Sequence, residues 1–346
     1  MAKPAKQHAF SIIKVVLPLL IGFYLLWHFY SAMDLQTKKV FFKAINEANY
    51  FWIILSVILG FISHLIRAYR WKYLLEPVGK VPKFWHRYHA LMIGYIVNLL
   101  IPRAGEATRA AMLFRTDKIP FSRAFGTIIG ERVLDLLMLG ILFLAALILN
   151  FDDLLSLKDI LTDSSQEKNE EGSWFFTVFL SVTMGAILII ALLWSKLGVV
   201  RKKLALFIKE VMDGVLSIFK SKHPGKFIFQ TVLIWILYVT FFWICFFAFE
   251  VTADFPIAGV LIGYIAGTLG LLFINGGIGA YPYLVGVVVT YYMGDLAGSE
   301  GIGKALGMII WLSQTLLMIM LGLISLIFIP RNYKKEKDDE VGEAKV

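Results

Sequence analysis

Apolar blocks of about 20 residues recur along this 346-residue chain and are separated by polar segments. A helix of that length crosses the ~30 Å hydrocarbon core of a bilayer. Hydrophobic residues make up 58% of the chain and charged residues only 17%, whereas average globular domains are ~25% charged. The sequence therefore predicts an all-α polytopic membrane protein, whose backbone hydrogen bonds are satisfied within each helix.

The distribution of charge predicts how the chain crosses the membrane. We expect about six full spans, at 10–30, 50–66, 124–150, 174–194, 227–249 and 304–329. Basic residues collect in four segments, namely 67–87, 103–123, 195–226 and the C-terminal tail. Because cytoplasmic loops carry the excess of Lys and Arg, we expect both termini inside the cell and a location in the inner (cytoplasmic) membrane.

The same pattern divides the chain into one membrane domain and short flanks. We expect residues 1–9 to be a cytoplasmic N-terminus, 10–330 a single transmembrane domain, and 331–346 a disordered cytoplasmic tail. Residues 195–226 combine basic residues with apolar residues at helical spacing. This is typical of an amphipathic helix on an anionic inner leaflet, and a plain cytoplasmic connector would carry the same charges.

Two apolar stretches are interrupted in the middle, and we expect them to re-enter the membrane as helical hairpins. The first, 88–114, turns at Pro102 and Gly105, and its first arm is too short to cross. The second, 256–293, turns at the glycine-rich residues 275–279, and its arms of 18 and 17 residues leave open whether it spans fully. Broken backbone at membrane depth is tolerated only where it is buried in protein or lines a cavity.

The two hairpins belong to an inverted repeat. Residues 50–150 and 227–329 each contain a span, a hairpin and a second span, in opposite orientations. Interrupted segments in corresponding positions of two inverted halves are the sequence feature that best indicates a transporter's binding site.

Six ionisable residues surround the first hairpin and are candidates for substrate binding. They are Arg103, Glu106, Arg109, Glu131, Arg132 and Asp135. The first three are spaced i, i+3 and i+6 and share roughly one helix face, and the last two acids are spaced i, i+4. Guanidinium groups beside a helix N-terminus suit a phosphate, and the acids would orient them or carry a coupling proton. The alternative is a structural network without ligand contact.

The second turn is rich in glycine, so little side chain covers its backbone. This allows either close approach to a substrate or ion or tight helix packing. Its candidate residues are Asn275, Gly276, Gly277 and Gly279. We expect no cofactor and no metal, because the single cysteine excludes a Cys-based site and the histidines lack metal-ligand spacing. The net charge of +9 does not indicate nucleic acid, since the basic residues lie in short loops.

Three motifs carry a resemblance to a known family: N-L-L-I-P-R-A-G-E-x-x-R at 98–109, E-R-x-x-D at 131–135 and G-G-x-G at 276–279. The chain resembles, over roughly residues 10–330, the flippase-like transmembrane domain of lysylphosphatidylglycerol synthases. The resemblance implies a central lipid-accessible cavity between two re-entrant hairpins. It also implies that the motif residues, including Asn98, bind the substrate. It also implies translocation of a phospholipid or lipid-linked anion between leaflets.

This chain departs from the family pattern at two points. Tyr281 and Pro282 stand where a Glu often follows the glycine motif, and no soluble aminoacyl-transferase domain follows residue 329. Lysyl-lipid synthesis is therefore not expected of this chain, and the substrate stays open.

We therefore expect a lipid transporter or flippase and no enzyme, with anionic membrane lipids and the bilayer as partners and homo-oligomerisation left open. A membrane lipid phosphatase or transferase is the first rival, but it needs a nucleophile or a metal. Thr108 and Ser122, the hydroxyls near the ionisable cluster, have no evident general base. A lipid-binding protein that does not transport is the second rival.

Overall fold

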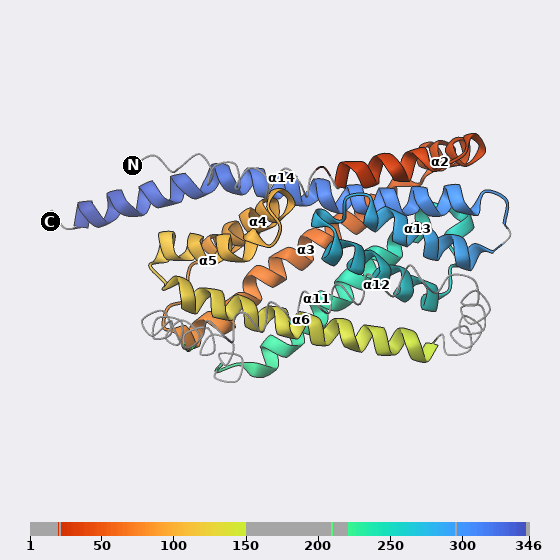
Figure 1. Ribbon diagram of the computed structural model, residues 1–346. Coiled ribbons are helices and arrows are strands. Elements are labelled where there is room, and N and C mark those ends of the chain that lie inside the picture. Colours follow the sequence, from red (N-terminus) through yellow and green to blue (C-terminus); the bar gives the residue numbers. More distant parts are fainter. Residues whose placement is uncertain (1–19, 21, 150–208, 210–220, 295, 344–346) are drawn as a thin grey trace, which may run out of the picture.

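Every element in the described part of the chain is a helix (Figure 1). The computed structural model describes residues 20, 22–149, 209, 221–294 and 296–343. The all-α prediction is confirmed for these residues. The predicted segments 1–9 and 174–194 lie outside them, as do most of the predicted span 10–30 and most of the connector 195–226, although 22–31 is helical.

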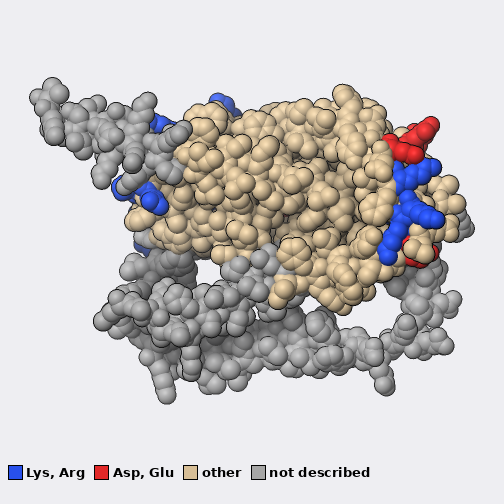
Figure 2. Space-filling model, turned by 90° about the horizontal axis from the view of Figure 1, so that it is seen from above, with Lys and Arg blue, Asp and Glu red and all other residues tan. Residues whose placement is uncertain are grey.

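Four helices are long and apolar enough to cross a membrane, and they match four of the predicted spans. They are α3 (Tyr50–Leu75), α6 (Phe121–Leu149), α11 (Pro224–Ile244) and α14 (Ser299–Glu343). In Figure 1, α6 and α14 run nearly along the long axis of the molecule, and α3 and α11 cross it obliquely. On the face seen in Figure 2, charged side chains gather toward the two ends, and the surface between them is largely uncharged.

Two helix hairpins start at opposite ends of the molecule, and their turns point toward each other (Figure 1). They are α4 (Phe84–Leu100) with α5 (Ala104–Asp117), and α12 (Ile257–Phe273) with α13 (Ala280–Met293), the latter joined through η5 (Asn275–Gly277). Their turns meet, because a Cβ placed on Gly276 would lie 3.0 Å from Cδ2 of Leu99. The middle of the molecule is therefore where both hairpins end.

Close backbone approach holds the arms of the first hairpin together. A Cβ at Gly105 would collide with the carbonyl oxygen of Gly94 on α4, so this crossing requires glycine. Asn98 Oδ1 accepts a hydrogen bond from the Gly105 N–H at 2.6 Å and thereby satisfies a free donor at the start of α5. At the base of the hairpin, His86 Nδ1 lies 3.0 Å from Asp117 Oδ2.

A short amphipathic helix occupies the segment before the second span, where the sequence predicts only a polar loop. This helix, α2 (Leu35–Glu47), begins at the N-cap Asp34, whose carboxylate accepts from the Thr37 N–H at 2.6 Å. It buries Phe41 and lies along α14 (Figure 1). A Cβ at Gly301 would lie 2.8 Å from Val40 Cβ, so the absence of a side chain there permits the contact.

Two helices extend beyond their predicted ends. Residues 67–75 were expected in a cytoplasmic loop, but α3 continues through them to Leu75. The helix α14 runs to Glu343 and so includes residues 331–343 of the tail for which the sequence predicts disorder. Lys and Glu are good helix formers, and a helix that has already nucleated is extended at little cost per residue.

Candidate functional site

Four arginines and three carboxylates form one ion-pair network between α3, α5 and α6. The members are Arg67, Arg70, Arg109, Arg132, Glu106, Glu131 and Asp135. The network lies inside the molecule, where charges persist only when they are paired and hydrogen-bonded.

Glu131 is the centre of this network, and its side chain is 1% exposed. Its Oε1 lies 2.6 Å from Nε of Arg67 and 3.3 Å from Nη2 of Arg70. Its Oε2 accepts from Nη2 of Arg109 at 2.9 Å. One carboxylate thus joins two arginines of α3 to one arginine of α5, and it ties the first hairpin to the helices on either side.

Arg132 connects this buried centre to the start of α5. Its Nη1 lies 3.3 Å from Asp135 Oδ2, and its Nη2 lies 3.0 Å from Glu106 Oε1. Asp135 in turn pairs with Arg67 at 2.5 Å. The Arg132 side chain is 39% exposed, whereas those of Arg67, Arg70 and Arg109 are at most 4% exposed. Arg132 is therefore the network's accessible cation.

Helix spacing brings these groups together. Arg67 and Arg70 are spaced i, i+3 on α3, and Glu131 and Asp135 are spaced i, i+4 on α6, so each pair occupies one helix face. Arg70 also donates to Thr231 Oγ1 of α11 at 2.7 Å. These contacts hold the charged faces of α3 and α6 in register.

The network carries an excess of positive charge. With every group ionised, four guanidinium groups face three carboxylates, which leaves one positive charge uncompensated. The Nε groups of Arg109 and Arg132 are buried and have no hydrogen-bond acceptor among the described residues. Arg109 instead places its guanidinium 4.3 Å from the centre of the Trp71 ring. Such a network favours an additional anion.

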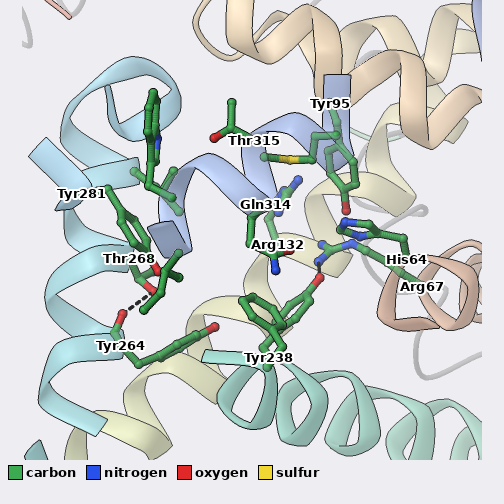
Figure 3. A pocket seen from close by; sticks show the side chains of 15 residues that line it. His64, Arg67, Tyr95, Arg132, Tyr238, Tyr264, Thr268, Tyr281, Gln314 and Thr315 are labelled. Carbon is green, nitrogen blue, oxygen red and sulfur yellow. Dashed lines mark hydrogen bonds between the residues drawn. The ribbon is translucent and has the colours of Figure 1, made fainter. Parts of the chain in front are cut away.

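A cavity of about 230 Å³ lies beside the network and between the two hairpins (Figure 3). Arg67 and Arg132 line one side of it. The helices of the second hairpin and α14 line the other side with Tyr264, Tyr281 and Gln314 among others. The ionic network and the cavity are therefore parts of one site.

The structure brings together five of the six predicted ionisable residues and leaves Arg103 outside. The Arg103 side chain is exposed, and no ion pair joins it to the network in the described part of the chain. Its backbone is left-handed, with φ of 58°, and it precedes α5 as the N-cap. The predicted i, i+3, i+6 face is wrong at this residue because helical periodicity starts only at Ala104. Asn98 lies near the network, with Nδ2 3.4 Å from both oxygens of Glu106.

The glycines of the second turn pack tightly and do not line the cavity. Gly276, Gly277 and Gly279 all have positive φ, at 64°, 65° and 74°, which glycine adopts without strain. The Gly276 carbonyl accepts from Trp311 Nε1 of α14 at 2.8 Å. A Cβ at Gly279 would lie 2.7 Å from the Leu25 carbonyl carbon. These contacts match the packing alternative; of Asn275 only the backbone is described.

Sequence reasoning missed Arg67 and Arg70, which were assigned to a cytoplasmic loop. Both lie within α3, and their charge is compensated by acids 61 or more residues later in the chain. Their i, i+3 spacing at the end of an apolar block is the signal that could have revealed them. It places both arginines on one helix face, as the i, i+4 spacing does for the two acids Glu131 and Asp135.

Comparison with known proteins identifies the family of this chain. The profile of the family described as "Lysylphosphatidylglycerol synthase TM region" matches residues 15–322. A UPF0104 membrane protein of Methanocaldococcus jannaschii is 32% identical over 96 residues, which are 27% of this chain and 29% of that protein. Its counterpart in Methanothermobacter thermautotrophicus is 30% identical over 115 residues, 32% of this chain and 34% of that protein.

The aligned segments thus span about a third of each of these relatives. No solved structure matches the chain. The family profile, in contrast, covers most of the sequence and both hairpins. The chain is therefore a membrane protein that belongs to the family of the lysylphosphatidylglycerol synthase transmembrane region.

Proposed function

We propose that this protein moves a lipid with a phosphate headgroup between the two leaflets of its membrane. The observation that carries the proposal is the uncompensated positive charge on the wall of a cavity that both hairpins enclose. Guanidinium groups match phosphate oxygens in geometry as well as in charge. Ionisable groups inside membrane proteins are costly and commonly mark substrate pathways.

The hairpins are re-entrant in this proposal. The longest arms, α4 and α12, have 17 residues each and reach about 26 Å at 1.5 Å per residue, which falls short of the hydrocarbon thickness. Their turns meet at Leu99 and Gly276, so the cavity would lie near the midplane and be reached from either side. Basic residues at the α4–α5 end support a cytoplasmic location for that end, following the positive-inside rule.

Arg132 is the residue that we assign to the lipid phosphate. It lines the cavity, is partly exposed, and retains an Nε–H without an acceptor among the described residues. A phosphate at this position would replace Glu106 as the partner of Nη2. The buried Glu131 holds Arg67, Arg70 and Arg109 and positions the cationic wall. Arg103, exposed at the turn, would meet the phosphate as it enters.

We favour transport over lipid hydrolysis because of the hydrogen bonding of Thr108, whose hydroxyl lies on α5 between Glu106 and Arg109. Thr108 Oγ1 donates to the Ala104 carbonyl at 2.9 Å, which is ordinary back-bonding within a helix. A nucleophile needs an adjacent general base instead.

A vesicle assay tests the proposal. The full chain is reconstituted with a trace of phosphatidylglycerol that carries a fluorophore on its acyl chain, and a membrane-impermeant reductant bleaches the outer leaflet. If the protein moves this lipid, bleaching proceeds beyond the outer-leaflet half of the signal. Arg132→Ala should abolish this excess, and Arg123→Ala, an exposed arginine on the same helix, should retain it.

Other outcomes would replace the proposal. Bleaching of only the outer-leaflet half with the intact protein, while the lipid co-purifies, would assign a lipid-binding role without transport. Release of phosphate from a lipid monophosphate would assign a phosphatase. Equal transport by Arg132→Ala and the intact chain would remove Arg132 from the mechanism.

A further inference from the structure

We infer a substrate class for this cavity: a lipid phosphate whose headgroup ends in an uncharged, hydroxyl-bearing group such as a polyol or a sugar, rather than in an ammonium group. The inference rests on the proposed function and adds selectivity to it. It follows from the wall opposite the arginines and from the absence of acids among the described residues that line the cavity.

The wall opposite the arginines is aromatic and carries neutral hydrogen-bonding groups. Tyr264, Tyr281 and Thr268 line it, Gln314 lies beside Arg132, and the Tyr264 hydroxyl is turned inward from α12 (Figure 3). Hydroxyl and amide groups of this kind can both donate and accept, which matches the hydroxyl groups of a polyol. Ring faces suit the C–H surfaces of such a group.

His64 adds a polar atom that has no partner. The side chain lines the cavity, the residue is 8% exposed, and Nδ1 is buried without a hydrogen-bond partner among the described residues. Its ring lies 5.1 Å from that of Tyr95 and beside Arg67 (Figure 3). A buried polar atom without a partner costs free energy, and a ligand hydroxyl next to the phosphate would supply the missing bond.

The charge of the cavity disfavours an ammonium headgroup. The charged residues on its wall are Arg67 and Arg132, and no Asp or Glu lines it among the described residues. The carboxylates nearest these arginines, Glu106, Glu131 and Asp135, are not among the lining residues and are already engaged by ion pairs. Aromatic rings can hold a quaternary ammonium, but here they share the cavity with two guanidinium groups. An ammonium group in this cavity would be repelled by the two guanidinium groups. Repulsion between like charges in contact lowers the affinity several-fold at least.

Headgroup competition in the vesicle assay tests this inference. Three lipids with the same labelled acyl chains are compared: phosphatidylglycerol, phosphatidylethanolamine and phosphatidate. We expect phosphatidylglycerol to move about tenfold faster than phosphatidylethanolamine, which corresponds to one repulsive contact. We expect phosphatidate, which has the phosphate but no hydroxyl group beyond it, to move about threefold more slowly than phosphatidylglycerol.

Two variants assign the preference to the cavity wall. His64→Ala and Tyr264→Phe should each reduce the preference for phosphatidylglycerol over phosphatidate, measured as the ratio of the two transport rates. His28→Ala, an exposed histidine on the helix 22–31, should change neither rate. Thermal unfolding of each variant in detergent separates a loss of folding from a loss of selectivity.

The assay distinguishes a failure of the proposed function from a failure of the substrate class. If the intact protein moves none of the three lipids, the proposed function fails. If it moves all three at equal rates, or moves phosphatidylethanolamine fastest, transport stands and the substrate class is wrong. If soluble glycerol phosphate competes as well as the lipid at equal concentration, the site belongs to a water-soluble phosphate ester and the lipid assignment is overturned.

Discussion

Arg109 Nη2 lies 2.9 Å from Glu131 Oε2, so the returning arm of the first hairpin is tied to the following long helix by a buried ion pair. The same carboxylate also contacts Arg67 and Arg70 of α3. A single acid therefore contacts three buried cations, and among the described residues it is the only ion-pair partner of Arg109.

We predict that Glu131→Gln severely destabilises the protein. Breaking a buried ion pair by removing one partner costs about 3–5 kcal/mol, and here three arginines share the lost partner. The measurement is the unfolding midpoint in detergent, which should fall strongly. Glu47→Gln, an exposed acid at the end of α2, is the control and should shift the midpoint little. Equal shifts would show that the network does not support the fold.

We predict opposite effects for two glycine substitutions. Gly105→Ala places a Cβ against the carbonyl of Gly94 and the side chain of Asn98, so it should separate the hairpin arms, lower stability and abolish transport. Gly140→Ala in α6 meets no atom within 4 Å and should raise stability by about 0.5–1 kcal/mol. Thermal unfolding of both variants checks this pair, and a neutral Gly105→Ala would refute the close crossing.

We predict that the second turn is held in place by Trp311. Its Nε1–H donates to the Gly276 carbonyl, and Trp311→Phe removes this bond while keeping most of the ring. The expected loss is about 1 kcal/mol of stability, together with faster amide exchange in residues 274–279. Hydrogen exchange followed by mass spectrometry measures it. Unchanged exchange at the turn would mean that other contacts hold it.

We predict a pH dependence at the base of the first hairpin. Burial acts to raise the pKa of Asp117, but hydrogen bonds from His86 and Thr116 outweigh it and lower the pKa below its usual value. A lowered pKa in the folded state stabilises the protein above the unfolded value of ~3.9, and this contribution is lost as pH falls through the folded value. Asp117→Asn should make the melting temperature less dependent on pH below about pH 4. If the melting temperature of the variant depends on pH as that of the intact protein does, this linkage is contradicted.

Several features of the site were predictable because they depend on local spacing. The breaks at Pro102 and Gly105 mark the first turn, and the i, i+4 spacing of Glu131 and Asp135 places both acids on one face of α6. These patterns need no information from distant residues. The sequence therefore predicts the first hairpin and the acidic half of the network.

The remaining members depend on tertiary partners. A hydropathy count ends the second span at Arg67, yet α3 continues because α6 supplies the counter-charges. The orientation of Arg103 changes because it is the N-cap in a left-handed conformation and not the first residue of the helix. Neither effect can be read from the periodicity of a single segment.

The retention of a phospholipid tests the central claim most directly. Native mass spectrometry of the protein released from lipid nanodiscs counts phosphatidylglycerol molecules that stay bound as collision energy rises. The arginine-lined cavity predicts that one phospholipid is retained by the intact chain and by Arg123→Ala, and that it is lost from Arg132→Ala at lower energy. Equal retention by Arg132→Ala and the intact chain would contradict a phosphate site at this cavity.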